Sequence, residues 1–136
     1  MNQHYPFTLL PLPYSYQALE PFLDERTLHF HHDKHLQTYV DQLNQILKPY
    51  PHLHNKTLTE LLSCLNCLPE EIQNGIRNNA GGVYNHQLYF ALMSPQEQEP
   101  SPFMKDLLCR SFGSLEQWKN IMKNSALTQF GSGYAW

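Results

Sequence analysis

Four of the eight histidines lie within the seven residues from His29 to His35, where a long amphipathic segment begins. A helix advances about 100° per residue, which places the apolar residues of this segment on one side and the polar residues on the other. The apolar residues are Leu28, Leu36, Val40, Leu43, Ile46 and Leu47. The pattern predicts a helix from about Asp24 to Lys48, which Pro49 ends.

A line of polar rings follows one edge of this apolar face. His31, His35 and Tyr39 succeed one another at intervals of one helical turn. Because an unpaired buried polar group costs about 1–3 kcal/mol, inward-pointing rings need a partner, which can be a metal ion, a second histidine or water. The alternative is a helix edge whose histidines are simply solvated.

Composition excludes several classes of function. A chain of 136 residues fits one domain or slightly more, and a formal net charge of -3 provides no basic surface for nucleic acid. No apolar run is long enough to cross a bilayer, and the first residues lack the charged and apolar regions of a signal peptide. We therefore expect a cytoplasmic protein that binds neither nucleic acid nor membrane.

Prolines and turn residues divide the first two thirds of the chain. The first 16 residues contain three prolines and are predicted to form an extended apolar strap. Residues 16–22 are predicted to form a short helical turn, and Pro49–Lys56 a loop in which His52 and His54 are solvated. A capping box, Thr57 with Glu60, begins a short helix that runs to about Cys67.

A second long helix is predicted from Pro69 to about Met93, with proline near its first position and acidic residues in its first turn. Glycine inside a helix costs about 1 kcal/mol, so glycines there indicate that another backbone or a ligand approaches closely. The glycines in question are Gly75, Gly81 and Gly82.

The last third of the chain follows a polar, proline-rich connector. We predict an N-terminal helical hairpin domain over 1–93, a linker over 94–102 and a separate C-terminal part over 103–136. Two helices are expected in that last part, Phe103–Phe112 and Leu115–Phe130, with Gly131 as the C-terminal cap of the second. The final residues alternate small and aromatic side chains, as at the start of a buried strand.

Three cysteines are present, and two of them, Cys64 and Cys67, form a C-x-x-C motif. No second pair or downstream histidine pair completes a zinc site. The motif also comes late in an apparent helix, away from the βαβ context of redox motifs. We therefore interpret the pair as small, partly buried thiols without chemistry.

The two long helices can bring two histidines together. An antiparallel hairpin places His31 opposite a histidine of the second helix, where His86 is the only candidate. Imidazoles on facing helices are a common beginning of a metal site. Imidazole suits iron, manganese, zinc and copper alike, so this pair does not select the metal.

Five segments carry a family resemblance. They are residues 10–21 (LPLPYSYQALEP), 31–40 (HHDKHLQTYV), 78–86 (NNAGGVYNH), 112–114 (FGS) and 130–136 (FGSGYAW). In this order the chain resembles the iron/manganese superoxide dismutase family from end to end. The resemblance implies a mainly α fold: an N-terminal antiparallel helical hairpin followed by the first helices of a truncated α/β domain.

The resemblance also implies roles for individual residues. His31 and His86 would be metal ligands, while His35 and Tyr39 would line the channel to the metal and Tyr39 would help to deliver protons. The reaction would convert superoxide to dioxygen and hydrogen peroxide at a manganese or iron ion. Gly82 stands where iron-type members often have glutamine, which favours manganese, whereas Val83-Tyr84 looks more like the iron type.

Departures from the family pattern concern the rest of the site. The family adds an aspartate and a third histidine from its C-terminal domain, and its subunits form a homodimer. Here no histidine follows His86 and no aspartate follows Asp106. Two of the four protein ligands are then absent, so we expect a truncated and impaired superoxide dismutase.

Two other functions remain open at this point. The chain could be an inactive relic or a helical binding module whose exposed apolar surface recruits a partner. It could also be a di-iron or hemerythrin-like bundle that uses His31 and His35 at i, i+4. The absence of Glu-x-x-His motifs argues against a ferritin-like site.

Overall fold

The structure, a computed structural model, describes residues 3–96, 98–131 and 133–136. These residues are mainly helical, and none of them forms a β-strand. This confirms the predicted mainly α fold with an N-terminal helical hairpin. The chain divides into two compact units, one that ends at Gln96 and one that extends to Trp136. Each unit is described by itself.

Three consecutive helical segments form the first arm of the hairpin: α1 (Glu25–Leu28), η1 (His29–Leu36) and α2 (Gln37–Leu47). Asp24 caps the N-terminus by accepting a hydrogen bond from the backbone N–H of Thr27 at 2.9 Å. The predicted helix over 24–48 is therefore confirmed in position. Its conformation differs in one part, because η1 is a π-helix.

The π-helical segment η1 contains the four clustered histidines. A π-helix closes i→i+5 hydrogen bonds in place of i→i+4 bonds, and such segments often occur at functional sites. The rings of His31 and His35, four residues apart in this segment, have centroids 5.7 Å apart. Hydrophobic periodicity does not reveal this change of helix type, so the sequence analysis missed it.

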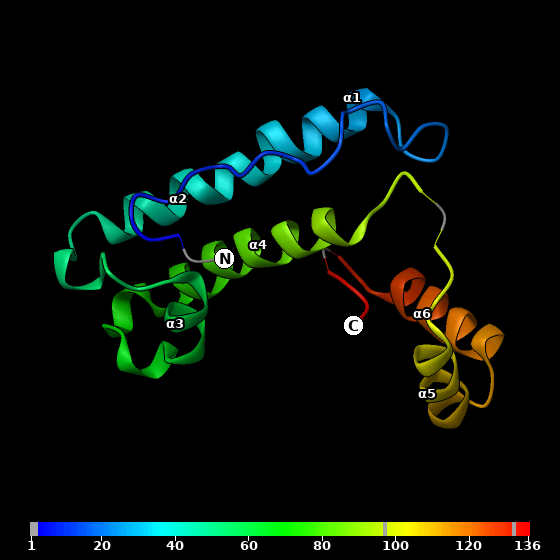
Figure 1. Cartoon of the computed structure of the whole chain (residues 1–136). Coiled ribbons are helices and arrows are strands. Elements are labelled where there is room, and N and C mark those ends of the chain that lie inside the picture. The colour runs from blue at the N-terminus through cyan, green and yellow to red at the C-terminus, as the bar shows by residue number, and fades with distance from the viewer. Residues whose placement is uncertain (1–2, 97, 132) are drawn as a thin grey trace. The chain divides into compact units, whose positions relative to one another are not determined.

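The second arm of the hairpin is α4 (Glu70–Leu92), which runs antiparallel to α2 (Figure 1). Two glycines permit close packing. A Cβ at Gly75 would lie 2.9 Å from Cδ1 of Ile46, and one at Gly82 would lie 2.6 Å from Cδ1 of Tyr39. The predicted close approach is found at these two positions, but the approaching atoms belong to side chains and not to another backbone or a ligand. It is wrong for Gly81, where the nearest atom, in Leu62, is 4.0 Å away.

The N-terminal strap crosses the hairpin, as predicted, and Figure 1 shows it along α2. Phe7 is buried in the core, and its backbone N–H and C=O pair with the side-chain amide of Asn44, both at 2.8 Å. The Tyr14 hydroxyl donates to the Phe90 carbonyl of α4 at 3.0 Å. The strap is therefore attached to both arms. Residues 16–22 form turns, as expected.

The connection between the arms contains η2 (Pro51–Leu53), α3 (Leu58–Ser63) and η3 (Leu65–Cys67). The predicted capping box at the start of α3 is present, with Thr57 and Glu60 bonded reciprocally. The prediction that His54 is solvated is wrong. This half-buried ring bonds the Leu47 carbonyl at 3.0 Å and stacks on Tyr5. His52 is exposed, as expected.

The reading of Cys64 and Cys67 as partly buried thiols is also wrong. Both residues are exposed and joined by a disulfide. α3 ends at Ser63 and η3 begins at Leu65, and the Cα atoms of the two cysteines are 5.3 Å apart, within the range that a disulfide spans.

The second unit contains α5 (Pro102–Phe112) and α6 (Leu115–Thr128), which pack against each other. Gly113, with φ +85°, ends α5, and Ser114 caps α6. Gly131 is not the predicted cap, because α6 ends three residues before it. The described residues 133–136 form no strand, which agrees with the lack of a described neighbouring strand to pair with.

No helix in the part of the chain that the structure describes has the length and apolarity needed to span a membrane.

Candidate metal centre

Three histidines from the two arms of the hairpin form one cluster: His31 and His35 on η1, and His86 on α4. One potential ligand nitrogen from each ring lies within 4.8 Å of the others. The ring centroids are 4.9 Å apart for His31 and His86 and 5.0 Å apart for His35 and His86. The two histidines that were predicted to face each other therefore do so, and His35 joins them.

Tyr39 lies beside the cluster at the beginning of α2. Its ring centroid is 5.0 Å from that of His35 and 5.4 Å from that of His86. The same ring packs against α4 at Gly82, one turn before His86, where an added Cβ would lie 2.6 Å from Cδ1 of Tyr39. All four residues singled out from the sequence thus meet in one region of the hairpin.

A backbone hydrogen bond orients His86. Its Nδ1 lies 2.7 Å from the Gly82 carbonyl, which can only accept, so Nδ1 carries the proton. The lone pair of the ring is then on Nε2. Histidines that bind metals commonly donate their other ring N–H to a carbonyl or carboxylate in this way, which fixes both the tautomer and the ring orientation.

Burial keeps two of the rings neutral. It lowers the pKa of His31 to about 4, with further contributions from the neighbouring rings of His86, His35 and His32. Burial also lowers the pKa of His86, although the hydrogen bond to Gly82 opposes this and the nearby His35 adds to it. Both imidazoles are therefore unprotonated at neutral pH, which is the form that binds a metal ion.

Aromatic side chains from the end of α4 cover His31. The rings of Tyr89 and Phe90 lie 5.5 Å and 5.1 Å from it, centroid to centroid. The sequence analysis did not identify Tyr89 as part of the site. Its position was predictable in principle, because residues three and four after His86 lie on the same helix face.

The fourth clustered histidine, His32, has a different role. It is 4% exposed, and its ring nitrogens lie 2.8 Å from the Leu10 carbonyl and 2.7 Å from Oδ1 of Asp33. Asp33 also accepts from the Tyr16 hydroxyl at 2.5 Å and pairs with Nδ1 of His29 at 2.6 Å. Both ring nitrogens of His32 therefore have hydrogen-bond partners within the protein, and these bonds join the strap to η1.

This network perturbs both of its acidic groups. Burial and the bond to Asp33 raise the pKa of Tyr16 to about 12. Burial alone raises the pKa of Asp33, but the hydrogen bonds from Tyr16, His29 and His32 outweigh it and lower that pKa to about 2. Asp33 therefore stays ionised beside the cluster, with its charge directed to its three partners.

The donor set suits a first-row transition metal. Three imidazole nitrogens on two packed helices, one of them oriented by a carbonyl, fit iron and manganese as well as zinc and copper. Within the described residues the cluster contains no carboxylate. His31, His35 and His86 are the residues that could hold the ion, and Tyr39 is the nearby hydroxyl group.

Comparisons with known proteins place this site in context. Residues 6–94 match the model described as iron/manganese superoxide dismutases, alpha-hairpin domain, and residues 100–136 match that family's C-terminal domain. The chain is similar to superoxide dismutase (Mn/Fe) 2 of Staphylococcus aureus strains Mu50, N315 and MW2. Each is 41% identical over 130 residues, which make up 96% of this chain and 64% of the relative. The chain thus spans less than two thirds of the length of these relatives.

Proposed function

The chain belongs to the iron/manganese superoxide dismutase family, and from this premise we propose that its hairpin supplies the helical half of a dismutase metal centre. The metal is manganese or iron, with manganese favoured by Gly82. The substrate is superoxide. The observation that carries the proposal is the meeting of His31, His35 and His86 nitrogens within 4.8 Å, on helices that belong to a matched dismutase domain.

Within the proposed centre, His31 and His86 are the ligands. Their neutral rings offer lone pairs at neutral pH, and the bond from His86 to Gly82 fixes one of them in direction. The bound metal would supply the redox chemistry, by alternating between two oxidation states as successive superoxide ions are oxidised and reduced.

His35 and Tyr39 have a different proposed role. His35 is exposed while Tyr39 is half-buried, and the two rings are in contact. The pair thus runs from an exposed ring to a half-buried ring at the edge of the cluster. We assign to them the access route, with the Tyr39 hydroxyl as the group that holds a water molecule and delivers a proton toward the reduced product.

Activity of the 136-residue chain alone is proposed to be low. The histidine cluster of the described residues includes no carboxylate, so the ion is held by neutral nitrogens and its charge is balanced less than in a site with an anionic ligand. Manganese or iron should then bind weakly and turn over superoxide slowly.

The test measures metal and activity together. The chain is loaded with manganese or iron, and bound metal and superoxide turnover are compared for the parent, His31→Ala and His86→Ala. Each substitution should reduce metal affinity at least roughly tenfold, because a ligand is lost. His52→Ala, at an exposed position of η2, is the control. Metal binding that is unchanged in both site variants contradicts the proposal.

The cellular setting is part of the proposal. We place the protein in the cytoplasm, as expected from its sequence, and we propose that the full-length form is a homodimer, as the family resemblance implies. Fractionation of the source cells and analytical ultracentrifugation test these two points separately.

A binding module is the second candidate. Large apolar side chains are exposed on α5 and α6, among them Phe103, Leu107 and Ile121. A folded, monodisperse chain that binds neither metal nor superoxide favours this function over the dismutase.

A further inference from the structure

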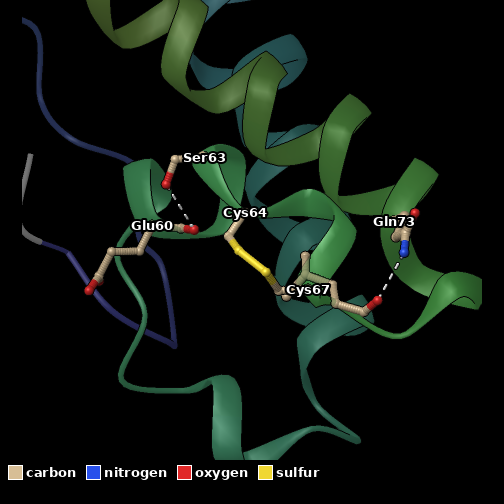
Figure 2. Close-up of a disulfide and its surroundings, with 6 residues drawn as sticks. Glu60, Ser63, Cys64, Cys67 and Gln73 are labelled. Atoms are coloured by element: carbon tan, nitrogen blue, oxygen red, sulfur yellow. Dashed lines mark hydrogen bonds between the residues drawn. A yellow bond between two sulfur atoms is a disulfide. The ribbon is translucent and has the colours of Figure 1, made fainter.

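A disulfide lies in the connection between the two arms of the hairpin, away from the histidine cluster. Figure 2 shows the disulfide between Cys64 and Cys67, which links the end of α3 to the turn that follows. We propose that these two cysteines form a reversible dithiol–disulfide couple that exchanges electrons with small thiols. The proposal does not depend on the metal centre.

The disulfide is accessible to a reactant. Cys64 and Cys67 are both exposed, and they line a surface cavity of about 410 Å³. Apolar side chains, Leu62 and Leu65, form part of the wall, and Arg77 of α4 lies in the same cavity. A small thiol can therefore reach either sulfur atom from solvent.

A purely structural role explains this bond poorly. A disulfide stabilises mainly by restricting the unfolded chain, and the effect is smallest for short loops. Here only two residues, Leu65 and Asn66, separate the cysteines. The bond also connects neighbouring turns of one segment and does not tie α3 to α4. Its formation and loss should consequently leave the hairpin folded.

Arg77 provides the electrostatic condition for exchange. The thiolate is the reactive form of cysteine, and a nearby guanidinium favours it. The Arg77 side chain is directed by a hydrogen bond from Nη1 to Oδ1 of Asn74 at 3.1 Å, and it lines the cavity with both cysteines. Reduction of the disulfide would thus produce thiols in a cavity that the Arg77 cation also lines.

Both directions of the couple balance. In reduction, a thiolate of dithiothreitol attacks one sulfur and forms a mixed disulfide. The second thiol of dithiothreitol then attacks the dithiothreitol sulfur of the mixed disulfide and releases the second protein sulfur. The products are two protein thiols and oxidised dithiothreitol. In oxidation, a protein thiolate attacks hydrogen peroxide to give a sulfenic acid and hydroxide, which takes up a proton from solvent to form water. The second thiol closes the disulfide with loss of another water molecule.

The test counts thiols by mass in the Cys109→Ser variant, which removes the exposed third cysteine. The protein is equilibrated at graded ratios of reduced to oxidised dithiothreitol, alkylated with iodoacetamide and weighed intact. We expect a single transition between chains that carry no carbamidomethyl group from iodoacetamide and chains that carry two. Equimolar hydrogen peroxide should restore the disulfide in the reduced protein. The additional variant Cys67→Ser should lose the transition.

Other outcomes overturn the proposal: a pair that dithiothreitol does not reduce, thiols that peroxide does not close into the disulfide, or oxidation to linked chains. Arg77→Ala should slow closure by peroxide by roughly threefold or more, because the thiolate is less favoured. Arg110→Ala, on the exposed face of α5, is the matched control. Equal rates in the two variants contradict the assignment of Arg77. Because the count requires no metal, it is independent of the dismutase proposal.

Discussion

Asp33 accepts hydrogen bonds from three side chains, and its carboxylate is the charge that holds His32 in place. Its pKa of about 2 in the folded protein lies below its ordinary value of 3.8. Between these values the unfolded chain binds the proton more readily, so the stabilisation is complete above about pH 4 and is lost as the pH falls to about 2.

We therefore predict that Asp33→Asn lowers the free energy of unfolding at pH 7 by about 1 kcal/mol, after allowance for solvent screening of a partly exposed carboxylate. The difference from the parent should shrink as the pH falls below 4. Urea unfolding at a series of pH values measures both effects, with Asp41→Asn as the control on an exposed part of α2. A difference that does not depend on pH would contradict the assigned hydrogen bonds.

At the level of residues, the sequence was informative where a pattern repeats. One-turn spacing of His31, His35 and Tyr39 predicted a common edge, and the hairpin brought His86 to it. The role of His32 was not predictable, because its partners, Leu10 and Tyr16, come from the strap. The path of that strap over the hairpin depends on tertiary packing, which proline positions alone do not give.

The packing of α2 against α4 depends on which glycine faces Tyr39. A Cβ at Gly82 would press into the base of that ring at 2.6 Å, whereas one at Gly81 would meet nothing closer than 4.0 Å. The two positions are adjacent in one helix and share the same intrinsic gain from alanine, about 1 kcal/mol. They therefore form a matched pair.

Gly81→Ala should stabilise the protein slightly, by up to about 1 kcal/mol. Gly82→Ala should be less stable than Gly81→Ala by about 1–3 kcal/mol, because overpacking displaces Tyr39. Thermal or urea unfolding of both variants provides the comparison. Equal stability of the two would show that α2 and α4 do not approach each other as described.

Among the elements, the boundaries of the long helices were predictable and the local conformation was not. Asp24, Pro49 and the Thr57–Glu60 capping box marked helix ends that the structure confirms. The π-helix and the break at Cys64 left no such signal. The cysteine pair was misread because the C-x-x-C spacing alone does not tell whether the two side chains are exposed or joined by a disulfide.

At the scale of the whole molecule, the family identity explains why a hairpin of ordinary composition contains a histidine cluster. The first unit contains the hydrophobic core, and hydrogen bonds of Asn44 and Tyr14 attach the strap to it. His31, His35 and His86 lie together between its two arms. The second unit consists of two helices with exposed apolar side chains. The histidine cluster that could hold a metal ion in the described residues belongs to the first unit.

His31 and His86 are proposed to hold one metal ion between the arms of the hairpin. X-ray absorption spectroscopy of the manganese- or iron-loaded chain tests it directly, because imidazole ligands give a characteristic scattering pattern. We predict at least two imidazoles on the metal in the parent, and the loss of one in His31→Ala and in His86→Ala. A spectrum without imidazole scattering, or one that neither substitution changes, would contradict it.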